Sequence, residues 1–307
     1  MNTQNKKQAF DALCADVLAM AATRGPLCQP RKLRKTLKTM RGVADDVDYR
    51  EALVLINCMG RMSPVRTRKH LVRLRDDLTA LGDAARFERL ARLIRDYLHP
   101  VSLTQHGYNA TFGQMDGDHI YRSMGKALAP LQALNRPFYI YAGALLGHVR
   151  DGALIAHDDD LDCAIMLGEC APDAVAPLWR QIKVQLAELD LLTEASRTSG
   201  EAVFKMKTDL GVVVDLFPSW TYQGRLSVYP YALEEIDPAH VLPLRSFGHD
   251  PLMNPADPEA FLAHCYGPDW RIPDPYFSLN WKQKYKMFHR LLSVPYALDP
   301  RDGDPRD

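Results

Sequence analysis

The first third of the chain has the apolar spacing of amphipathic helices. Apolar residues recur three and four positions apart from residue 5 to about residue 99, and we see no internal repeat in this stretch. Glycine and proline interrupt the pattern, so we expect four or five helices before residue 100. The interruptions fall at residues 25–26, 42, 60–64, 82 and 100.

After residue 118 the pattern changes to a mixture of helices and short strands. Apolar strands of this kind imply a sheet that is covered by helices, so the expected fold class is α+β or α/β behind an all-α N-terminal region. The expected helices cover residues 118–134, 174–189, 258–265 and 281–292, and the expected strands cover residues 138–141, 161–167, 202–207 and 212–217.

Charge divides the chain at about the same place. The whole chain has 38 Lys and Arg against 38 Asp and Glu, a balance that predicts no nucleic-acid partner. Residues 1–105 carry an excess of nine positive charges and residues 106–307 an equal negative excess. We therefore expect a basic helical region, 1–105, and a second domain, 106–307. The basic helices form either a solvated face or a surface that contacts an anionic membrane or acceptor.

Cysteine spacing and hydropathy restrict the setting of the protein. The six cysteines include no Cys-x-x-Cys pair, so neither a zinc ribbon nor a disulfide framework is expected. No apolar run reaches the length of a membrane-spanning helix, and Asp11 and Asp16 interrupt the apolar stretch nearest the N-terminus. We therefore predict a cytoplasmic protein.

The most informative segment is His-Asp-Asp-Asp-Leu-Asp at residues 157–162, which runs directly into an apolar stretch. Side chains alternate along a strand, so Asp158, Asp160 and Asp162 would share one face. Clustered carboxylates repel one another unless a cation lies among them. Oxygen ligands on a rigid strand favour Mg²⁺ or Mn²⁺, shared with the phosphates of a substrate.

Other interpretations of this segment are weaker. An EF-hand loop would need glycine where Cys163 stands, and the following residues have the pattern of a strand. A solvated acidic turn does not fit the apolar strand directly behind it. The Asp-x-Asp of a sugar-nucleotide glycosyltransferase also binds metal and diphosphate, and it is the flanking sequence that argues against this interpretation.

Two flanking segments add context to the aspartates. Residues 143–152 read Gly-Ala-Leu-Leu-Gly-His-Val-Arg-Asp-Gly, a glycine-containing turn that can bring backbone N–H groups and Arg150 against phosphate. Residues 214–218 read Val-Asp-Leu-Phe-Pro, which places Asp215 alone in an apolar strand, where a buried carboxylate needs a cation or a donor. Lys205, on the strand before Asp215, could reach the phosphates of a donor or form a solvated edge.

Together these three motifs resemble the LicD/fukutin family. A Tyr-Gly pair after a short helix, Tyr266-Gly267, agrees with the family's C-terminal block, and the resemblance covers about residues 118–275. It implies a nucleotidyltransferase-type fold, a mixed sheet flanked by helices. The basic region has no counterpart in the family. Ala144 stands where the family usually has Ser or Thr, and His157 where it usually has Trp.

The resemblance also implies roles for single residues. Asp160 and Asp162 match the paired metal ligands of the family, Asp215 matches its third carboxylate, and Asp158 is a further candidate ligand. These aspartates would hold Mg²⁺ or Mn²⁺ and form the catalytic site. The residues that match the phosphate-side turn are Gly143, Gly147, Arg150 and Gly152, to which Lys205 is added as a candidate.

The function that follows is a phosphotransferase of cell-surface polysaccharide biosynthesis. It would move a phospho-substituted alcohol, of the phosphocholine or polyol-phosphate type, from a CDP-activated donor to the hydroxyl of a glycan or lipid-linked glycan, in the cytoplasm or at the inner face of the membrane. Two alternatives remain open. One is transfer of a nucleoside monophosphate to a small molecule or protein, and the other is a non-catalytic protein that binds a nucleotide or glycan.

Overall fold

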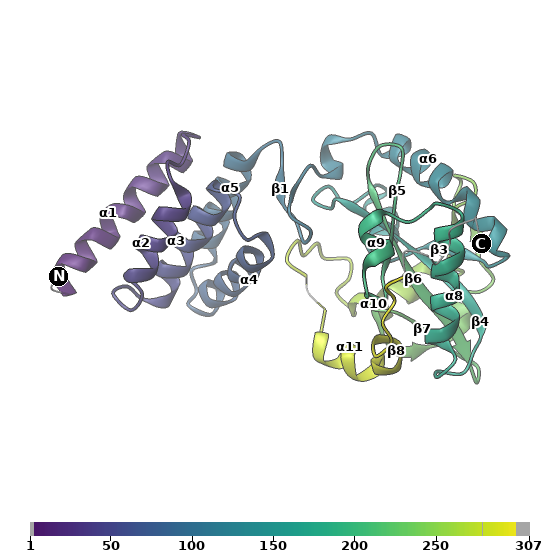
Figure 1. Cartoon of the computed structure of the whole chain (residues 1–307). Helices are drawn as coiled ribbons and strands as arrows, with labels where there is room; N and C mark the ends of the chain where they lie inside the picture. The colour runs from purple at the N-terminus through teal and green to yellow at the C-terminus, as the bar shows by residue number, and fades with distance from the viewer. Residues whose placement is uncertain (1–2, 278, 299–307) are drawn as a thin grey trace. The chain divides into compact units, whose positions relative to one another are not determined.

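The computed structural model describes residues 3–277 and 279–298, and it divides the chain into two compact units, Met1–Thr111 and Phe112–Asp307. The fold is α+β, as predicted: an all-α region comes first, and a mixed, curled sheet with helices follows (Figure 1). No helix in the described part of the chain is long and apolar enough to cross a membrane.

The first unit is a bundle of helices followed by a short hairpin. Each interhelical break lies where glycine or proline interrupts the apolar pattern. The bundle buries leucines at helical spacing, for example Leu71, Leu74 and Leu90, whereas Leu18 and Leu81 are exposed. The elements are α1 (Thr3–Ala22), α2 (Pro30–Thr39), α3 (Asp46–Met59), α4 (Pro64–Ala80), α5 (Ala84–Leu98), β1 (Ser102–Leu103) and β2 (Tyr108–Asn109).

The second unit contains a sheet of six strands within its described residues. The strand order is β3-β4-β6-β7-β8. β5 also pairs with β6, along the first residues of that strand, whereas β7 pairs along its last residues. β4 and β6 are parallel and all the other pairs in this sheet are antiparallel. The strands are β3 (Phe138–Ile140), β4 (Asp160–Glu169), β5 (Phe204–Lys207), β6 (Val213–Tyr222), β7 (Arg225–Val228) and β8 (Ala232–Ile236).

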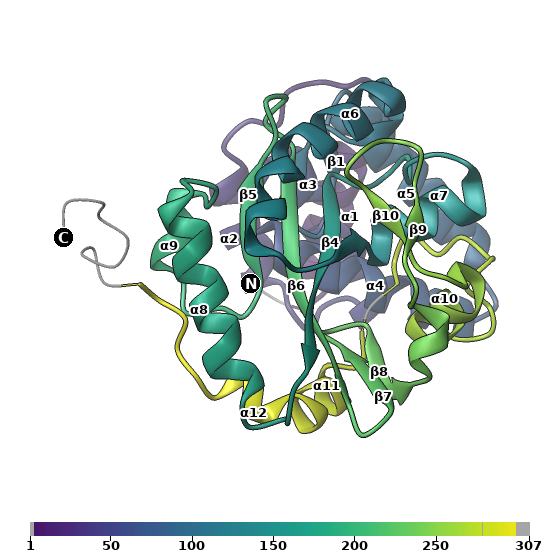
Figure 2. The same ribbon diagram turned by 90° about the vertical axis from the view of Figure 1, so that its right-hand side faces the viewer.

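Helices cover both faces of this sheet. α8 packs on one face through Trp179, whose ring stacks on Phe204 at 4.4 Å, and α10 packs on the other through Phe261, which contacts Tyr139 and Tyr141. Figure 2 shows the sheet between α8 and α9 on one side and α7 and α10 on the other. The helices are α6 (Gly117–Leu128), α7 (Ala142–Asp151), α8 (Val175–Glu188), α9 (Glu194–Thr198), α10 (Pro258–Tyr266), α11 (Trp281–Met287) and α12 (His289–Leu292).

Short elements complete the second unit. The predicted helix at 118–134 is α6 continued by a 3₁₀ helix, and the predicted strands at 138–141, 161–167, 202–207 and 212–217 correspond to β3, β4, β5 and β6. The hairpin of β7 and β8 was not predicted. The remaining elements are η1 (Phe112–Gln114), η2 (Ala129–Leu134), η3 (Pro238–His240), β9 (Arg245–Ser246) and β10 (Met253–Asn254).

Candidate active site

The two central parallel strands bring two of the predicted aspartates side by side. β4 and β6 pair in a register that sets Asp162 opposite Asp215, and both residues are only 6% exposed. Alternation along β4 puts Asp160, its first residue, on the same face as Asp162. The next residues along both strands are buried and apolar, so these carboxylates project from a rigid part of the sheet.

The turn between β3 and α7 closes over these carboxylates. The backbone N–H of Gly143 donates to Oδ2 of Asp162 at 2.7 Å, and the N–H of Tyr141 donates to the backbone carbonyl of Asp162 at 3.0 Å. Ala142, between them, has a φ of 41°, a left-handed conformation that is uncommon for a residue with a side chain. The turn therefore holds an amide donor and the start of a helix directly at the carboxylate.

Gly143 leaves room for two acidic side chains at once. A Cβ atom at this position would lie 2.7 Å from Oδ2 of Asp158 and 3.0 Å from Oδ2 of Asp162. Both distances are shorter than ordinary van der Waals contacts, so a larger residue would displace at least one carboxylate. The structure thus brings Gly143, Asp158 and Asp162 together, and a shared role in one site stays a prediction.

Electrostatics in the cluster favour a bound cation. Burial raises the pKa of the Asp162 carboxyl well above its ordinary value, and the charges of Asp160, Asp158 and Asp215 raise it further. Burial and the charge of Asp160 act on the pKa of Asp158 in the same direction. Negative charge in this cluster is costly in the absence of a counter-ion, and a divalent cation would remove that cost.

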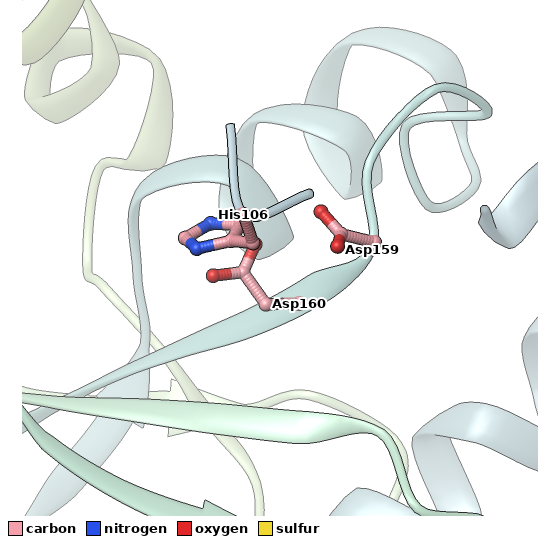
Figure 3. Close-up of side chains that lie close together, drawn as sticks. All are labelled: His106, Asp159 and Asp160. Atoms are coloured by element: carbon pink, nitrogen blue, oxygen red, sulfur yellow. The ribbon is translucent and has the colours of Figure 1, made fainter. Parts of the chain in front are cut away.

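Asp159 and Asp160 extend the cluster at the beginning of β4. One carboxylate oxygen of each lies within 4.8 Å of the other (Figure 3), and acidic groups at this spacing could bind a metal ion. The residues therefore fit an oxygen-ligated divalent metal. Asp159 was not predicted as a ligand, because strict alternation along an ideal strand turns its side chain away from that of Asp160. The strand, however, begins only at Asp160.

Lys205 is the cation that the structure itself places in the site. β5 pairs with β6 so that Lys205 stands opposite Asp215, and its ammonium nitrogen lies 2.6 Å from both carboxylate oxygens of Asp215. The Asp215 side chain is 9% exposed and that of Lys205 is 32% exposed. The ammonium group is thus bound on one side and open to solvent on the other.

The other residues of the predicted phosphate turn lie farther along α7. The guanidinium of Arg150, near the C-terminal end of the helix, donates two hydrogen bonds to the carboxylate of Asp151 at 2.8 and 2.7 Å. Gly147 packs against the loop after the helix, where a Cβ would lie 2.6 Å from the carbonyl oxygen of Ala153. Gly152 ends the helix with a φ of 65°. A role for these three residues in binding phosphate stays a prediction.

Tyr231 borders the carboxylates and was not found from the sequence. Burial raises the pKa of its hydroxyl well above the ordinary value, and the charges of Asp162, Asp160, Asp158 and Asp215 raise it further, Asp162 the most. The backbone N–H of Tyr231 donates to the hydroxyl oxygen of Tyr141, and its ring lies 5.5 Å from that of Tyr266. No motif marks this tyrosine, because the turn and hairpin that position it have no regular apolar pattern.

Comparison with known families agrees with this geometry. Residues 135–246 match the family model described as LicD/FKTN/FKRP, nucleotidyltransferase domain. The match confirms the resemblance inferred from the motifs. It includes the aspartates, Gly143, Lys205 and Tyr231, and it excludes the helical unit. A search of curated proteins found no relative that matches the chain.

Proposed function

We propose that this chain, whose residues 135–246 match a LicD/FKTN/FKRP nucleotidyltransferase domain, is a metal-dependent phosphotransferase. A domain of this family implies phosphotransferase-like or nucleotidyltransferase-like activity. The observation that carries the proposal is the pairing of Asp162 with Asp215 across two parallel strands, with the amide of Gly143 bonded to Asp162. The proposed donor is CDP-activated, and the proposed acceptor is a glycan or a lipid-linked glycan.

Asp158, Asp160, Asp162 and Asp215 are the residues that would hold Mg²⁺ or Mn²⁺. When bound, such an ion neutralises the charge of a diphosphate and orients it for in-line displacement. The protein's own contribution is to keep these carboxylates in place. Gly143 fixes the rotation of the Asp162 carboxylate through its N–H, and the buried strands fix the spacing between Asp162 and Asp215.

Asp215 has two states in this proposal, one paired with Lys205 and one released from it. In the free protein the ammonium group occupies both oxygens of Asp215, so this carboxylate is neither a good ligand nor a good base. A donor diphosphate offers Lys205 a competing anion on its solvent-exposed side. When Lys205 turns toward the phosphates, Asp215 becomes able to bind a cation or to accept the proton of the acceptor hydroxyl.

The proposed reaction then balances as follows. The acceptor oxygen forms a bond to the phosphorus that carries the transferred alcohol, and the bond from that phosphorus to the bridging oxygen of the diphosphate breaks. CMP leaves with the bridging oxygen, and the hydroxyl proton passes to Asp215. The alternative, nucleotidyl transfer, uses the same residues but attacks the phosphorus nearest the nucleoside, so a nucleoside triphosphate would release pyrophosphate.

A donor screen tests the proposal. Purified protein is incubated with Mg²⁺ and, in turn, CDP-choline, CDP-glycerol, CDP-ribitol or a nucleoside triphosphate, and CMP and pyrophosphate are measured. We expect CMP from one of the CDP donors, at least 100-fold less of it from Asp162→Asn, and unchanged turnover from Asp173→Asn, whose side chain is exposed on a loop. Pyrophosphate would favour nucleotidyl transfer. Turnover of none of these donors, with Mg²⁺ still bound, would favour the non-catalytic alternative.

A further inference from the structure

The helical unit carries its positive charge in two segments that contain no acidic residue. Seven Lys and Arg lie between Asp16 and Asp45, and six more lie between Glu51 and Asp76. The charged residues of these segments lie on α2, on the first three turns of α4, and on the loops beside these two helices. The acidic residues of the unit all lie outside the two segments.

The two helices begin in the same way. α2 starts from Gln-Pro-Arg-Lys-Leu-Arg-Lys at Gln29 and α4 from Ser-Pro-Val-Arg-Thr-Arg-Lys at Ser63. The residue before each proline is left-handed, with φ of 50° at Gln29 and 48° at Ser63. Because the two helices start at equivalent residues, their basic residues fall at equivalent places on the first two turns, and α4 repeats the basic pattern of α2.

These two helix starts are adjacent in space. The guanidinium of Arg34 on α2 donates to the hydroxyl oxygen of Ser63 at 3.0 Å. Gly60, just before α4, packs so closely on Pro30 that a Cβ would lie 2.6 Å from the proline Cβ. The two basic segments therefore form one continuous surface, which we call the basic face. Its exposed members are Arg24, Arg31, Lys32, Lys35, Lys38, Arg41, Arg61, Arg66, Lys69 and Arg73.

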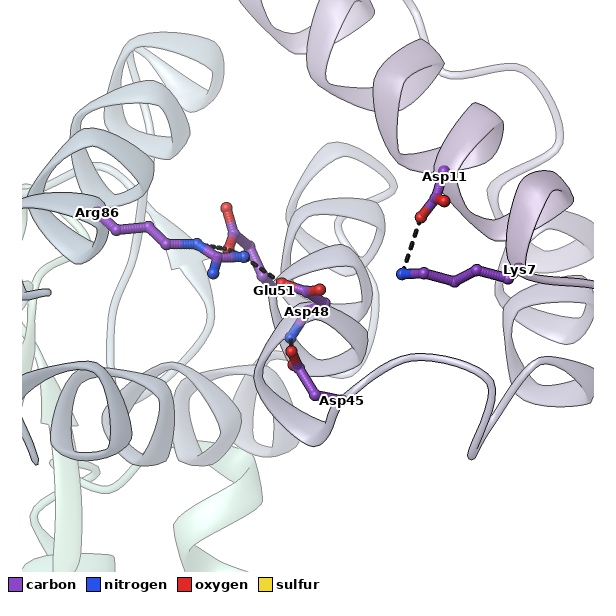
Figure 4. Close-up of polar contacts among 6 residues, drawn as sticks. All are labelled: Lys7, Asp11, Asp45, Asp48, Glu51 and Arg86. Atoms are coloured by element: carbon purple, nitrogen blue, oxygen red, sulfur yellow. Dashed lines mark hydrogen bonds and ion pairs between the residues drawn. The ribbon is translucent and has the colours of Figure 1, made fainter. Parts of the chain in front are cut away.

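Most of the positive charge of the basic face is not paired within its own unit. Elsewhere in the bundle, acids and bases pair: Arg86 bonds to Asp48 and Glu51, and Lys7 to Asp11 (Figure 4). Within the described residues, none of the ten exposed members of the basic face has an ion-pair partner. A surface with this much unbalanced charge attracts polyanions over about 8–10 Å in physiological salt.

The side chains around the charges indicate which polyanion fits. Neither basic segment contains Phe, Tyr or Trp, so the basic face lacks the stacking platform of proteins that bind single-stranded nucleic acid. It contains an aliphatic side chain instead: Val65, beside Arg66 at the start of α4, is 54% exposed. Leu37 of α2 is buried in the bundle, so the helix adsorbs through its charges and does not insert.

We propose that the basic face docks this protein on a lipid bilayer with anionic headgroups. Each Lys or Arg close to such a surface strengthens binding, and screening by salt weakens it. The proposal is independent of the proposed function, because it involves neither nucleotide nor metal.

Sedimentation with vesicles tests the docking. The full chain is mixed, in EDTA, with vesicles of phosphatidylcholine alone or with 30% phosphatidylglycerol, where EDTA prevents divalent ions from bridging acidic residues to lipid. We expect binding to the anionic vesicles alone, and at least tenfold weaker binding at 0.5 M than at 0.1 M NaCl. The triple variant Lys32→Glu, Lys35→Glu, Arg66→Glu should bind at least tenfold less than the unaltered protein.

A matched control separates the basic face from total charge. Arg89→Glu, Arg92→Glu, Arg95→Glu changes the same net charge on exposed positions of α5, where Glu88 and Asp96 flank the three arginines, and it should keep at least half of the binding. Far-ultraviolet circular dichroism checks that each variant is folded. If the glutamate variant is unfolded, the triple alanine variant at the same positions, which suits a helix, should still bind at least threefold less.

Three outcomes would overturn the proposal. One is an equal loss of vesicle binding in the two triple glutamate variants, which would mean that binding depends on total charge and not on the basic face. Another is equal binding to neutral vesicles. The third is binding of a 30-nucleotide RNA or a 30-base-pair DNA that depends on Lys32, Lys35 and Arg66 while anionic vesicles are not bound, which would assign the basic face to nucleic acid.

Discussion

Gly143 is the residue whose substitution tests the candidate site most directly. In Gly143→Ala, the new Cβ must displace the carboxylates of Asp158 or Asp162, because it would lie within 3.0 Å of both. We expect at least tenfold weaker Mg²⁺ binding, measured as the metal concentration that gives the half-maximal rise in Tm. The strain should also lower the free energy of unfolding by about 1–3 kcal/mol.

Gly117→Ala is the matched control for this prediction. Gly117 begins α6, and a Cβ there would meet no atom within 4 Å. This variant should keep the Mg²⁺ response and gain slightly in helix propensity. If the Gly143 variant also responds to Mg²⁺ normally, Asp158 and Asp162 do not bind the same ion.

The raised pKa values of Asp158 and Asp162 predict a pH dependence of stability. Between their ordinary pKa of 3.8 and their raised values, the folded protein retains protons that the unfolded chain has released. The free energy of unfolding of the metal-free protein should therefore fall as the pH rises through the raised pKa values. Because metal replaces those protons, the rise in Tm caused by 5 mM Mg²⁺ should be larger at pH 8 than at pH 5.5.

The Asp162→Asn variant checks the origin of this effect. It removes one charge from the cluster, so the metal-free stability should depend less on pH and the difference between the two Mg²⁺ responses should shrink. Asp173→Asn should behave like the unaltered protein. A Mg²⁺ response that is equal at both pH values would separate metal binding from the two carboxyl groups.

At the level of elements, the pairing of β5 with β6 brings Lys205 against Asp215, and the ammonium group neutralises the charge of this carboxylate. Lys205→Met removes the ammonium group that contacts both oxygens of this buried carboxylate. A buried charge that loses its partner destabilises the fold, and partial exposure of Lys205 reduces the effect to about 1–2 kcal/mol in EDTA. With saturating Mg²⁺ the loss should become smaller, because metal compensates Asp215. Chemical denaturation with and without Mg²⁺ measures both values.

Lys207→Met provides the comparison on the same strand. Lys207 is exposed two residues farther along β5, so its replacement should change the free energy of unfolding by less than about 0.5 kcal/mol under either condition. An equal loss from Lys205→Met in EDTA and in Mg²⁺ would show that the lysine and the metal do not compete for Asp215.

The same strands show what the sequence could predict. β4 continues from Asp162 into the apolar run 163–167, and β6 has apolar residues on both sides of Asp215, so both strands and their carboxylates could be recognised. The contact of Lys205 with Asp215 could not, because it depends on the antiparallel register of β5, which no local pattern encodes. Arg150 was expected to face phosphate, but sequence spacing does not reveal that Asp151 is within reach of its guanidinium.

The strands β7 and β8 could not be predicted from the pattern of apolar residues. β7 and β8 come from a stretch rich in Pro, Gly and Tyr, and β8 buries Ala232 and Ile236 without regular alternation of polar residues. Their pairing with the sheet, and through it the position of Tyr231 near the aspartates, results from tertiary contacts with Tyr141 and Tyr266. Apolar periodicity therefore located the carboxylate edge of the candidate site but not its aromatic border.

At the scale of the whole molecule, charge and chemistry belong to different units. The carboxylates, Gly143 and Lys205 all lie within Phe112–Asp307, whereas the basic face lies within Met1–Thr111. The chain is neutral overall only because these two opposite charges cancel. Two compact units with separate cores can each tolerate surface changes without altering the other's interior.

This separation predicts how the basic face relates to the reaction. None of the residues changed in the triple variant Lys32→Glu, Lys35→Glu, Arg66→Glu belongs to the unit that holds the aspartates. In the absence of acceptor, its rate of donor hydrolysis should therefore stay within twofold of that of the unaltered protein. The Mg²⁺ concentration that gives half-maximal activity should also stay within twofold. With a lipid-linked acceptor in anionic vesicles, the same variant should have a KM for acceptor at least fivefold higher, since local concentration at the membrane is lost. In neutral detergent micelles the two proteins should have equal KM values. A fall in donor hydrolysis without acceptor would instead mean that the helical unit supports the chemistry itself.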